Sequence, residues 1–225
     1  MLLLATIVSY VWNSTGTAVV TNPSSQPNAL AVDSSNALYV VESAQNRVQK
    51  YVFGASNNST TVAGQMNGAS GSTSDFLNGP SDVAVDSSGN VYVLDKLNNR
   101  VQLWNSGASN GTTVAGFIRW TLGASNWTLI AGSANGVAGS SSTMLNTPMG
   151  LTLDPSGNIY VADSLNHRIQ FFANQSNGTT IAGITGAAGS SATQLNIPQG
   201  VALDSQLNLY VADWGNDRVQ KFSRS

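Results

Sequence analysis

A single motif occurs four times in this chain and constrains its fold more than any other feature. The copies begin at Pro27, Pro80, Pro148 and Pro198. They read PNALAVDSSNALYVVESAQNRVQKY, PSDVAVDSSGNVYVLDKLNNRVQLW, PMGLTLDPSGNIYVADSLNHRIQFF and PQGVALDSQLNLYVADWGNDRVQKF. Each copy holds short apolar alternations bounded by Asp, Ser and Gly, which is typical of strands and turns rather than of amphipathic helices. The repeat therefore predicts β-blades arranged radially, as in a propeller.

The spacing of the copies shows one further duplication. An aspartate follows the first strand of every copy, at Asp33, Asp86, Asp154 and Asp204. The middle interval is 68 residues long, against 53 and 50 for the other two. Within it, residues 101–116 (VQLWNSGASNGTTVAG) align without a gap with residues 117–132 (FIRWTLGASNWTLIAG). We therefore expect a duplicated strand-turn-strand insert at 117–132.

Composition excludes several classes of function. Charged residues make up 9% of the chain and the formal net charge is -2, so there is no electrostatic signature for nucleic acid or an anionic membrane. Cysteine is absent, which excludes a disulfide framework and a cysteine-ligated metal. A chain of 225 residues can form a single all-β domain. We expect one all-β propeller of about four blades, with no nucleic-acid partner.

The second copy shows the order of strands expected within a blade. Strand a is predicted at residues 83–85, strand b at 91–94, strand c at 100–104 and strand d at 112–116. In the a–b turn, the carboxylate of Asp86 can accept backbone N–H groups and Gly89 can adopt a positive φ. The fourth copy ends after strand c, so its repeat supplies no strand d.

Residues 1–22 allow two interpretations. Leu2 to Trp12 is an apolar run of signal-peptide length with the small residues Gly16 and Ala18 beyond it, although no Lys or Arg precedes it. The run is too short to span a membrane. Alternatively, residues 12–20 (WNSTGTAVV) look like the end of strand c and strand d of the other copies, and would close the ring and remove exposed strand edges. We expect a leader or ring-closing strand over 1–22 and the propeller over 23–225.

The repeated pattern resembles a known family. The elements P-x-G-V-A-L-D, G-N-x-Y-V-A-D and N-H-R-I-Q, the last beginning at Asn166, resemble the NHL repeat. The resemblance covers residues 27–222 and implies a β-propeller, commonly of six blades. Four copies imply a small propeller, a degenerate extra blade or a piece of a larger protein. Members of the family include adhesion and sensor ectodomains, RNA-binding modules and a few enzymes, so the resemblance does not decide the function.

Most of the acidic residues obey the repeat. Of 11 acidic residues, eight occupy two repeated positions, one in the a–b turn and one at the end of strand b. An arginine follows the strand-b acid by five residues in every copy, a spacing that crosses the b–c loop. We expect a structural ion pair in each blade: Glu42–Arg47, Asp95–Arg100, Asp163–Arg168 and Asp213–Arg218.

The same recurrence argues against catalysis, because a catalytic site needs unlike residues at one place. His167 is the single histidine, so a His-based zinc site of the kind used by amidating lyases with this repeat cannot be built. It occupies a loop position that other copies fill with Asn or Asp, which favours a loop-capping role. We predict no catalytic residue, no metal site and no cofactor. The enzyme alternative is a divalent-metal hydrolase of the lactonase kind, for which Glu42 is the sole glutamate.

The loops divide between two faces of the blades. Antiparallel order places the a–b and c–d turns on one face and the b–c and d–a loops on the other. The first face carries N-glycosylation sequons, with one more in the N-terminal segment, and these are acceptors only in a secreted chain. The candidate sites are Asn13, Asn57, Asn58, Asn110, Asn126, Asn174 and Asn177. The other face carries long d–a loops at 65–79, 133–147 and 184–197, which are either flexible spacers or binding loops.

We therefore expect a non-catalytic binding module in the extracellular space or secretory pathway, with a protein or glycan partner on the d–a and b–c face. Trp214 stands where other copies have Ser or Lys and is a candidate contact anchor. The candidate binding residues are Asn78, Asn146, Asn196 and Trp214. A lactonase-like hydrolase and an inactive fragment of a larger NHL-repeat protein are the alternatives.

Overall fold

The computed structural model describes residues 27–52, 58–115, 118–119, 128–129, 137–173 and 177–224. In these residues the chain forms antiparallel β-sheets, joined in part by four single-turn 3-10 helices. The predicted all-β fold is confirmed. Across the same residues, no helix has the length and apolar character needed to cross a membrane.

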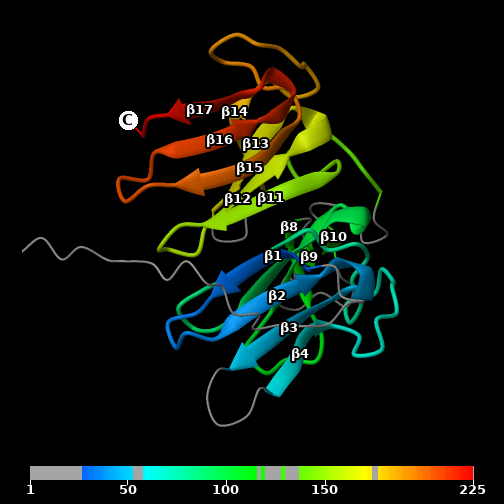
Figure 1. The fold of residues 1–225 in the computed structure, drawn as a ribbon. Helices are drawn as coiled ribbons and strands as arrows, with labels where there is room; N and C mark the ends of the chain where they lie inside the picture. Colours follow the sequence, from blue (N-terminus) through cyan, green and yellow to red (C-terminus); the bar gives the residue numbers. More distant parts are fainter. Residues whose placement is uncertain are drawn as a thin grey trace, which may run out of the picture.

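Four of the sheets follow the four sequence copies, and we call them blades 1 to 4 (Figure 1). Blade 1 contains β1 (Pro27–Val32), β2 (Leu38–Glu42), β3 (Arg47–Val52) and β4 (Asn58–Gly64). Blade 2 contains β5 (Asp82–Val85), β6 (Val91–Asp95), β7 (Arg100–Trp104) and β8 (Thr112–Ala115). Blade 3 contains β11 (Pro148–Leu153), β12 (Ile159–Asp163), β13 (Arg168–Phe172) and β14 (Thr179–Gly183). Blade 4 contains β15 (Pro198–Leu203), β16 (Leu209–Asp213) and β17 (Arg218–Phe222).

The predicted strands match the observed ones closely, because the apolar alternation and the turn residues bound them on both sides. Strand c of blade 2 has the predicted bounds, while strands a and b each extend by one residue. The duplicated insert at 117–132 contributes a small antiparallel pair, β9 (Ile118–Arg119) with β10 (Thr128–Leu129). Residues 1–22, predicted as leader or closing strand, lie outside the described residues.

One aspartate builds the a–b turn of each blade. In blade 1, Asp33 Oδ1 accepts the backbone N–H groups of Ser35 and Ala37 at 2.9 and 3.0 Å. The same pair of bonds recurs in the other three blades. The last residue of the turn has a positive φ, which Gly89 and Gly157 adopt without steric cost. In blade 4 this place is taken by Leu207 at a φ of 62°, an unusual conformation for a leucine.

The hydrophobic core lies between neighbouring blades. Tyr39 and Val41 of blade 1 pack with Val83 and Trp104 of blade 2, and further clusters join blade 2 to blade 3 and blade 3 to blade 4. The first strands β1, β5, β11 and β15 lie next to one another in that order. The apolar surface buried at each junction therefore holds the blades in an arc, with blades 1 and 2 in the lower part of Figure 1 and blades 3 and 4 in the upper part.

The two ends of this arc expose apolar side chains. In blade 4, Val219 is 70% exposed, whereas the residues at the same position of the other blades, Val48, Val101 and Ile169, are 0% exposed. At the opposite end, Leu30 of β1 is 67% exposed. Because the repeat is the same, the difference follows from the neighbours: these two residues have no adjoining blade among the described residues.

Candidate binding face formed by the b–c and d–a loops

Each b–c connection is a 3-10 turn followed by a residue in the left-handed conformation. The turns are Ser43–Gln45, Lys96–Asn98, Ser164–Asn166 and Trp214–Asn216. The residues that end them are Asn46, Asn99, His167 and Asp217, with φ between 46° and 55°. Asn, Asp and His are the non-glycine residues most often found at positive φ, so the sequence suits the turn.

A buried acid lies at the centre of each b–c turn, and blade 3 shows the arrangement. The Oδ2 atom of Asp163 accepts hydrogen bonds from Arg168 Nε and Asn166 Nδ2, both at 2.8 Å. Its Oδ1 atom accepts the backbone N–H of Asn146 at 2.7 Å, from the d–a loop that leads into the blade. Burial raises the pKa of Asp163, and these three bonds oppose that effect. The carboxylate thus joins the b–c turn to the d–a loop.

The structure brings together every acid–arginine pair that the five-residue spacing predicted. The Nε–carboxylate distance is 2.7 Å for Arg47–Glu42 and Arg100–Asp95, and 2.8 Å for Arg168–Asp163 and Arg218–Asp213. All four acid side chains are 0% exposed. The arginines of the inner blades, Arg100 and Arg168, are 4% and 2% exposed. Those at the ends of the arc, Arg47 and Arg218, are 14% and 28% exposed.

The arginines also donate hydrogen bonds to the d–a loops. Arg168 Nη1 donates to the carbonyl oxygen of Ser140, and Nη2 donates to those of Ser141 and Met144, at 2.8–2.9 Å. Arg100 and Arg218 make corresponding bonds to the loops that precede their own blades. The sequence allowed the d–a loops to be either flexible spacers or binding loops. Flexible spacers fit poorly, because one guanidinium binds three carbonyl groups of each loop.

The recurring asparagines Asn78, Asn146 and Asn196 have a structural role through their backbone. Each donates its N–H to the strand-b acid of its blade at 2.6–2.7 Å. Each also accepts, through its carbonyl oxygen, a backbone N–H from the b–c turn. Their recurrence is therefore accounted for by loop geometry. The prediction of a binding role for their side chains stays a prediction.

The left-handed residues link each blade to the next. Asn46 Oδ1 accepts the N–H of Gly79 at 2.9 Å, and Asn99 Oδ1 accepts that of Thr147 at 2.8 Å. His167 Nδ1 accepts the N–H of Ile197 at 3.2 Å. A neutral imidazole has one donor and one acceptor nitrogen, so the proton of His167 is on Nε2. The predicted loop-capping role of this histidine corresponds to a bond between blades 3 and 4.

Trp214 and Lys96 occupy a position that is otherwise used for contact between blades. In blades 1 and 3 this position is Ser43 or Ser164, whose hydroxyl donates to the carbonyl of Pro80 or Pro198 in the next blade. Trp214, at the end of the arc, is 59% exposed. Its large side chain is thus presented to solvent on the b–c and d–a face.

A pocket that sequence reasoning missed opens on the same face between blades 1 and 2. It has a volume of about 350 Å³. Its lining consists of Pro27, Asn28, Ser43, Gly79, Pro80, Ser81, Lys96 and Leu97. Lys96 forms no ion pair with any described residue, and Leu97 is 59% exposed. The one sequence signal was that Lys96 replaces the serine of blades 1 and 3.

Glu42, the sole glutamate and the residue on which the lactonase-like alternative depends, lies in the ion pair of blade 1. Its carboxylate accepts hydrogen bonds from Arg47 Nε at 2.7 Å and from the hydroxyl of Tyr51 at 3.3 Å. Over the described part of the chain, no three His, Asp or Glu side chains are grouped as metal ligands.

The sequon residues lie partly within the described residues. Asn110 and Asn177 are exposed in c–d turns, and Asn58 begins β4. The remaining sequon residues, Asn13, Asn57, Asn126 and Asn174, lie outside the described residues.

Comparison with known proteins agrees with the repeat and the fold. The NHL repeat model matches residues 77–103, 145–172 and 195–222. No curated protein matches the chain. Solved structures similar in fold include virginiamycin B lyase from Staphylococcus aureus, at 13% identity and a TM-score of 0.55, over 91% of this chain and 57% of that one. An auxiliary nutrient binding protein from Bacteroides thetaiotaomicron has 16% identity and a TM-score of 0.61, over 86% and 47%.

A putative gluconolactonase is also similar, at 12% identity and a TM-score of 0.58, over 90% of this chain and 62% of that one. The chain therefore spans 47% to 62% of the length of these three structures. Repeated four-stranded blades packed along an arc define a β-propeller protein. The matched segments, with their recurrent Asp, Asn-x-Arg and left-handed turn residues, show that blades 2, 3 and 4 each contain an NHL repeat.

Proposed function

We propose that this NHL-repeat propeller is a non-catalytic binding module whose b–c and d–a face takes a protein or glycan partner. The observation that carries the proposal is the pocket between blades 1 and 2. It presents Lys96, a cation with no ion pair to any described residue, beside the exposed Leu97. Loops held on a rigid scaffold are a common place for recognition. Here the buried acid–arginine pairs supply that rigidity.

The chemistry of the face suits a polar partner with apolar patches. Lys96 supplies a positive charge, Asn28 supplies amide groups, and Leu97 and Trp214 supply apolar surface. Aromatic side chains of this kind are frequent anchors of interfaces. A sugar ring, which pairs hydroxyl groups with an apolar face, and a loop of a partner protein both present matching groups.

A glycan array is the first test, using the full chain and variants that keep the fold. Lys96→Ser restores the residue of blades 1 and 3, and Trp214→Ala removes the exposed ring. Each is expected to weaken binding by about 5- to 30-fold, corresponding to about 1–2 kcal/mol for a contact residue. Lys221→Ser in β17 is the matched control for charge and is expected to leave binding unchanged.

The same preparation distinguishes binding from catalysis. The fold is similar to enzymes as well as to a binding protein, and fold alone does not decide between them. We expect no turnover of lactone or ester substrates with Ca²⁺, Mg²⁺, Mn²⁺ or Zn²⁺ added. Turnover that depends on one of these ions would contradict the proposal and favour the lactonase-like alternative.

We further infer that the chain works outside the cytoplasm. The exposed sequon residues Asn110 and Asn177 support this proposal, because both stand in c–d turns away from the proposed binding face. Expression through a eukaryotic secretory pathway should yield glycans there. A mobility shift on treatment with peptide N-glycosidase checks this, and Asn110→Gln should remove part of the shift.

A further inference from the structure

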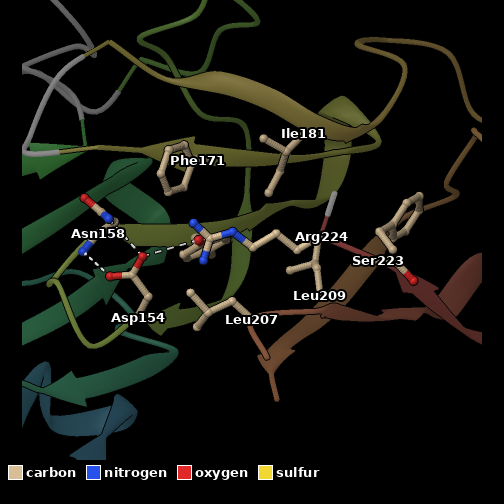
Figure 2. A pocket seen from close by; sticks show the side chains of 10 residues that line it. Asp154, Asn158, Phe171, Ile181, Leu207, Leu209, Ser223 and Arg224 are labelled. Carbon is tan, nitrogen blue, oxygen red and sulfur yellow. Dashed lines mark hydrogen bonds between the residues drawn. The ribbon is translucent and has the colours of Figure 1, made fainter. Parts of the chain in front are cut away.

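A second pocket lies on the opposite face, between blades 3 and 4 (Figure 2). Its volume of about 390 Å³ is within the range of sites for small ligands. The residues that line it are Asp154, Asn158, Tyr160, Phe171, Ile181, Leu207, Leu209, Phe222, Ser223 and Arg224. We call it the blade 3–4 groove. The a–b turns of blades 3 and 4 and the residues after β17 line it, so it is separate from the proposed binding face.

The same position between blades 1 and 2 is also hollow, which gives an internal comparison. That groove contains Tyr39 and Lys50, which correspond to Tyr160 and Phe171 in the blade 3–4 groove. Lys50 Nζ lies 3.1 Å from Asp33 and 4.9 Å from the centre of the Tyr39 ring. A lysine therefore lines this groove, and it forms an ion pair with the acid of the blade 1 a–b turn.

The blade 3–4 groove differs from the blade 1–2 groove at the residues that set its polarity. Phe171 replaces the lysine, and its ring packs on Tyr160 with a centroid distance of 4.9 Å. Leu207 stands where the blade 1–2 groove has Gly89. Leu207 keeps this place at a positive φ that glycine adopts more easily. These exchanges replace polar or absent side chains by apolar ones, so the groove is lined by hydrophobic rings and branched chains.

The blade 3–4 groove has a cation, Arg224, at its rim. Arg224 corresponds to Ser106 of the blade 1–2 groove, and its backbone N–H is held by Asn208 Oδ1 at 3.1 Å. Its side chain extends along the groove toward Asp154 in Figure 2, and it has no ion-pair partner among the described residues. Asp154 is itself satisfied, because it accepts bonds from Ser156, Asn158 and Tyr160.

We propose that the blade 3–4 groove binds a small amphipathic carboxylate, with its apolar part between Phe171 and Leu209 and its carboxylate on Arg224. An apolar cleft gains free energy when it buries a hydrocarbon or aromatic group. A guanidinium whose hydrogen-bond donors are available pairs well with a carboxylate. A neutral ligand would leave the arginine unused, and a cationic one would be repelled by it.

Three probes with the same alkyl chain test the ligand class: decanoate, 1-decanol and decyltrimethylammonium, each below its micelle concentration. Isothermal titration with the full chain should give saturable binding of decanoate and at least 10-fold weaker binding of the other two. Arg224→Gln should lower decanoate affinity at least 10-fold, to the level of decanol. Lys221→Gln, a matched charge removal in the same blade, should change nothing.

Two further measurements separate the site from general hydrophobic binding. Phe171→Leu, which places the residue of blade 2 in the groove, should keep decanoate binding, whereas Phe171→Lys should abolish it by filling the groove as Lys50 fills its own. NMR shift changes should centre on Ile181 and Leu209. Equal binding of all three probes, an equal effect of Lys221→Gln and Arg224→Gln, shifts centred on Tyr39 and Val91, or no saturable binding would each overturn the proposal.

Discussion

The Nε atom of Arg168 lies 2.8 Å from Oδ2 of Asp163, and the two side chains are 2% and 0% exposed. Removing one partner of such a pair leaves a buried charge without compensation. We expect Arg168→Ala to lower the free energy of unfolding by about 3–5 kcal/mol. Chemical denaturation measures the change. Arg224→Ala, in a side chain without an ion pair among the described residues, is the control and should shift it by less than about 0.5 kcal/mol.

The corresponding ion pair of blade 4 should contribute less to stability. Arg218 makes the same bond to Asp213 but is 28% exposed, so solvent can partly replace the lost partner. Arg218→Ala should therefore destabilise less than Arg168→Ala. An equal loss for Arg168, Arg218 and Arg224 would contradict the role given to the pairs.

The bond from Ile197 N–H to His167 Nδ1 should be replaceable by another short acceptor. Asn46 and Asn99 make the equivalent bond in blades 1 and 2 at similar backbone angles. We therefore expect His167→Asn to keep the melting temperature, since it retains both the acceptor and tolerance of positive φ. His167→Gly retains the backbone conformation but loses the acceptor, and should destabilise by about 1–3 kcal/mol. Equal stability of the two variants would show that the bond is unimportant.

Asp33 should make blade 1 sensitive to acid. The N–H of Ala37 is the main cause that lowers the pKa of Asp33 from 3.8 to about 2; Lys50, Ser35 and Tyr39 add to it and burial opposes it. Because the folded value is below the unfolded one, the contribution to stability is complete above about pH 4 and is lost as the pH falls toward 2. Asp33→Asn should remove this part of the acid dependence, as measured by thermal melting between those pH values.

Asp82 should have the opposite effect. Burial raises the pKa of Asp82, although its carboxylate accepts N–H groups from Leu151 and Val83. A carboxyl whose folded pKa exceeds the unfolded one favours the protonated form, so stability falls as the pH rises past the unfolded value. Asp82→Asn keeps an acceptor for Leu151 and should raise the melting temperature at pH 7. The gain should vanish in acid; a gain that is equal at both pH values would contradict this explanation.

Deletion of residues 1–22 tests the two interpretations of the N-terminus. If residues 17–20 supply strand d to blade 4, their loss should expose the hydrogen-bonding edge of β17 and promote dimers or aggregates. Light scattering and thermal melting measure this. A truncated chain that stays monomeric with an unchanged melting temperature would favour a leader.

Local pattern was enough to predict the strands, the turns and the acid–arginine pairs. Alternating apolar residues fix which side chains face a neighbouring blade, and a five-residue spacing places Asp163 opposite Arg168 across a tight connection. Both relationships depend only on residues close in sequence.

Only the tertiary structure determined which loops and neighbouring blades these strands and turns contact. Arg168 bonds to Ser140 and Met144, and His167 to Ile197, across separations set by how blades pack. Ile169 and Val219 occupy the same place in the repeat, yet one is 0% and the other 70% exposed. A repeated sequence gives both residues the same pattern, and only the presence or absence of an adjoining blade determines whether that apolar side chain is removed from water.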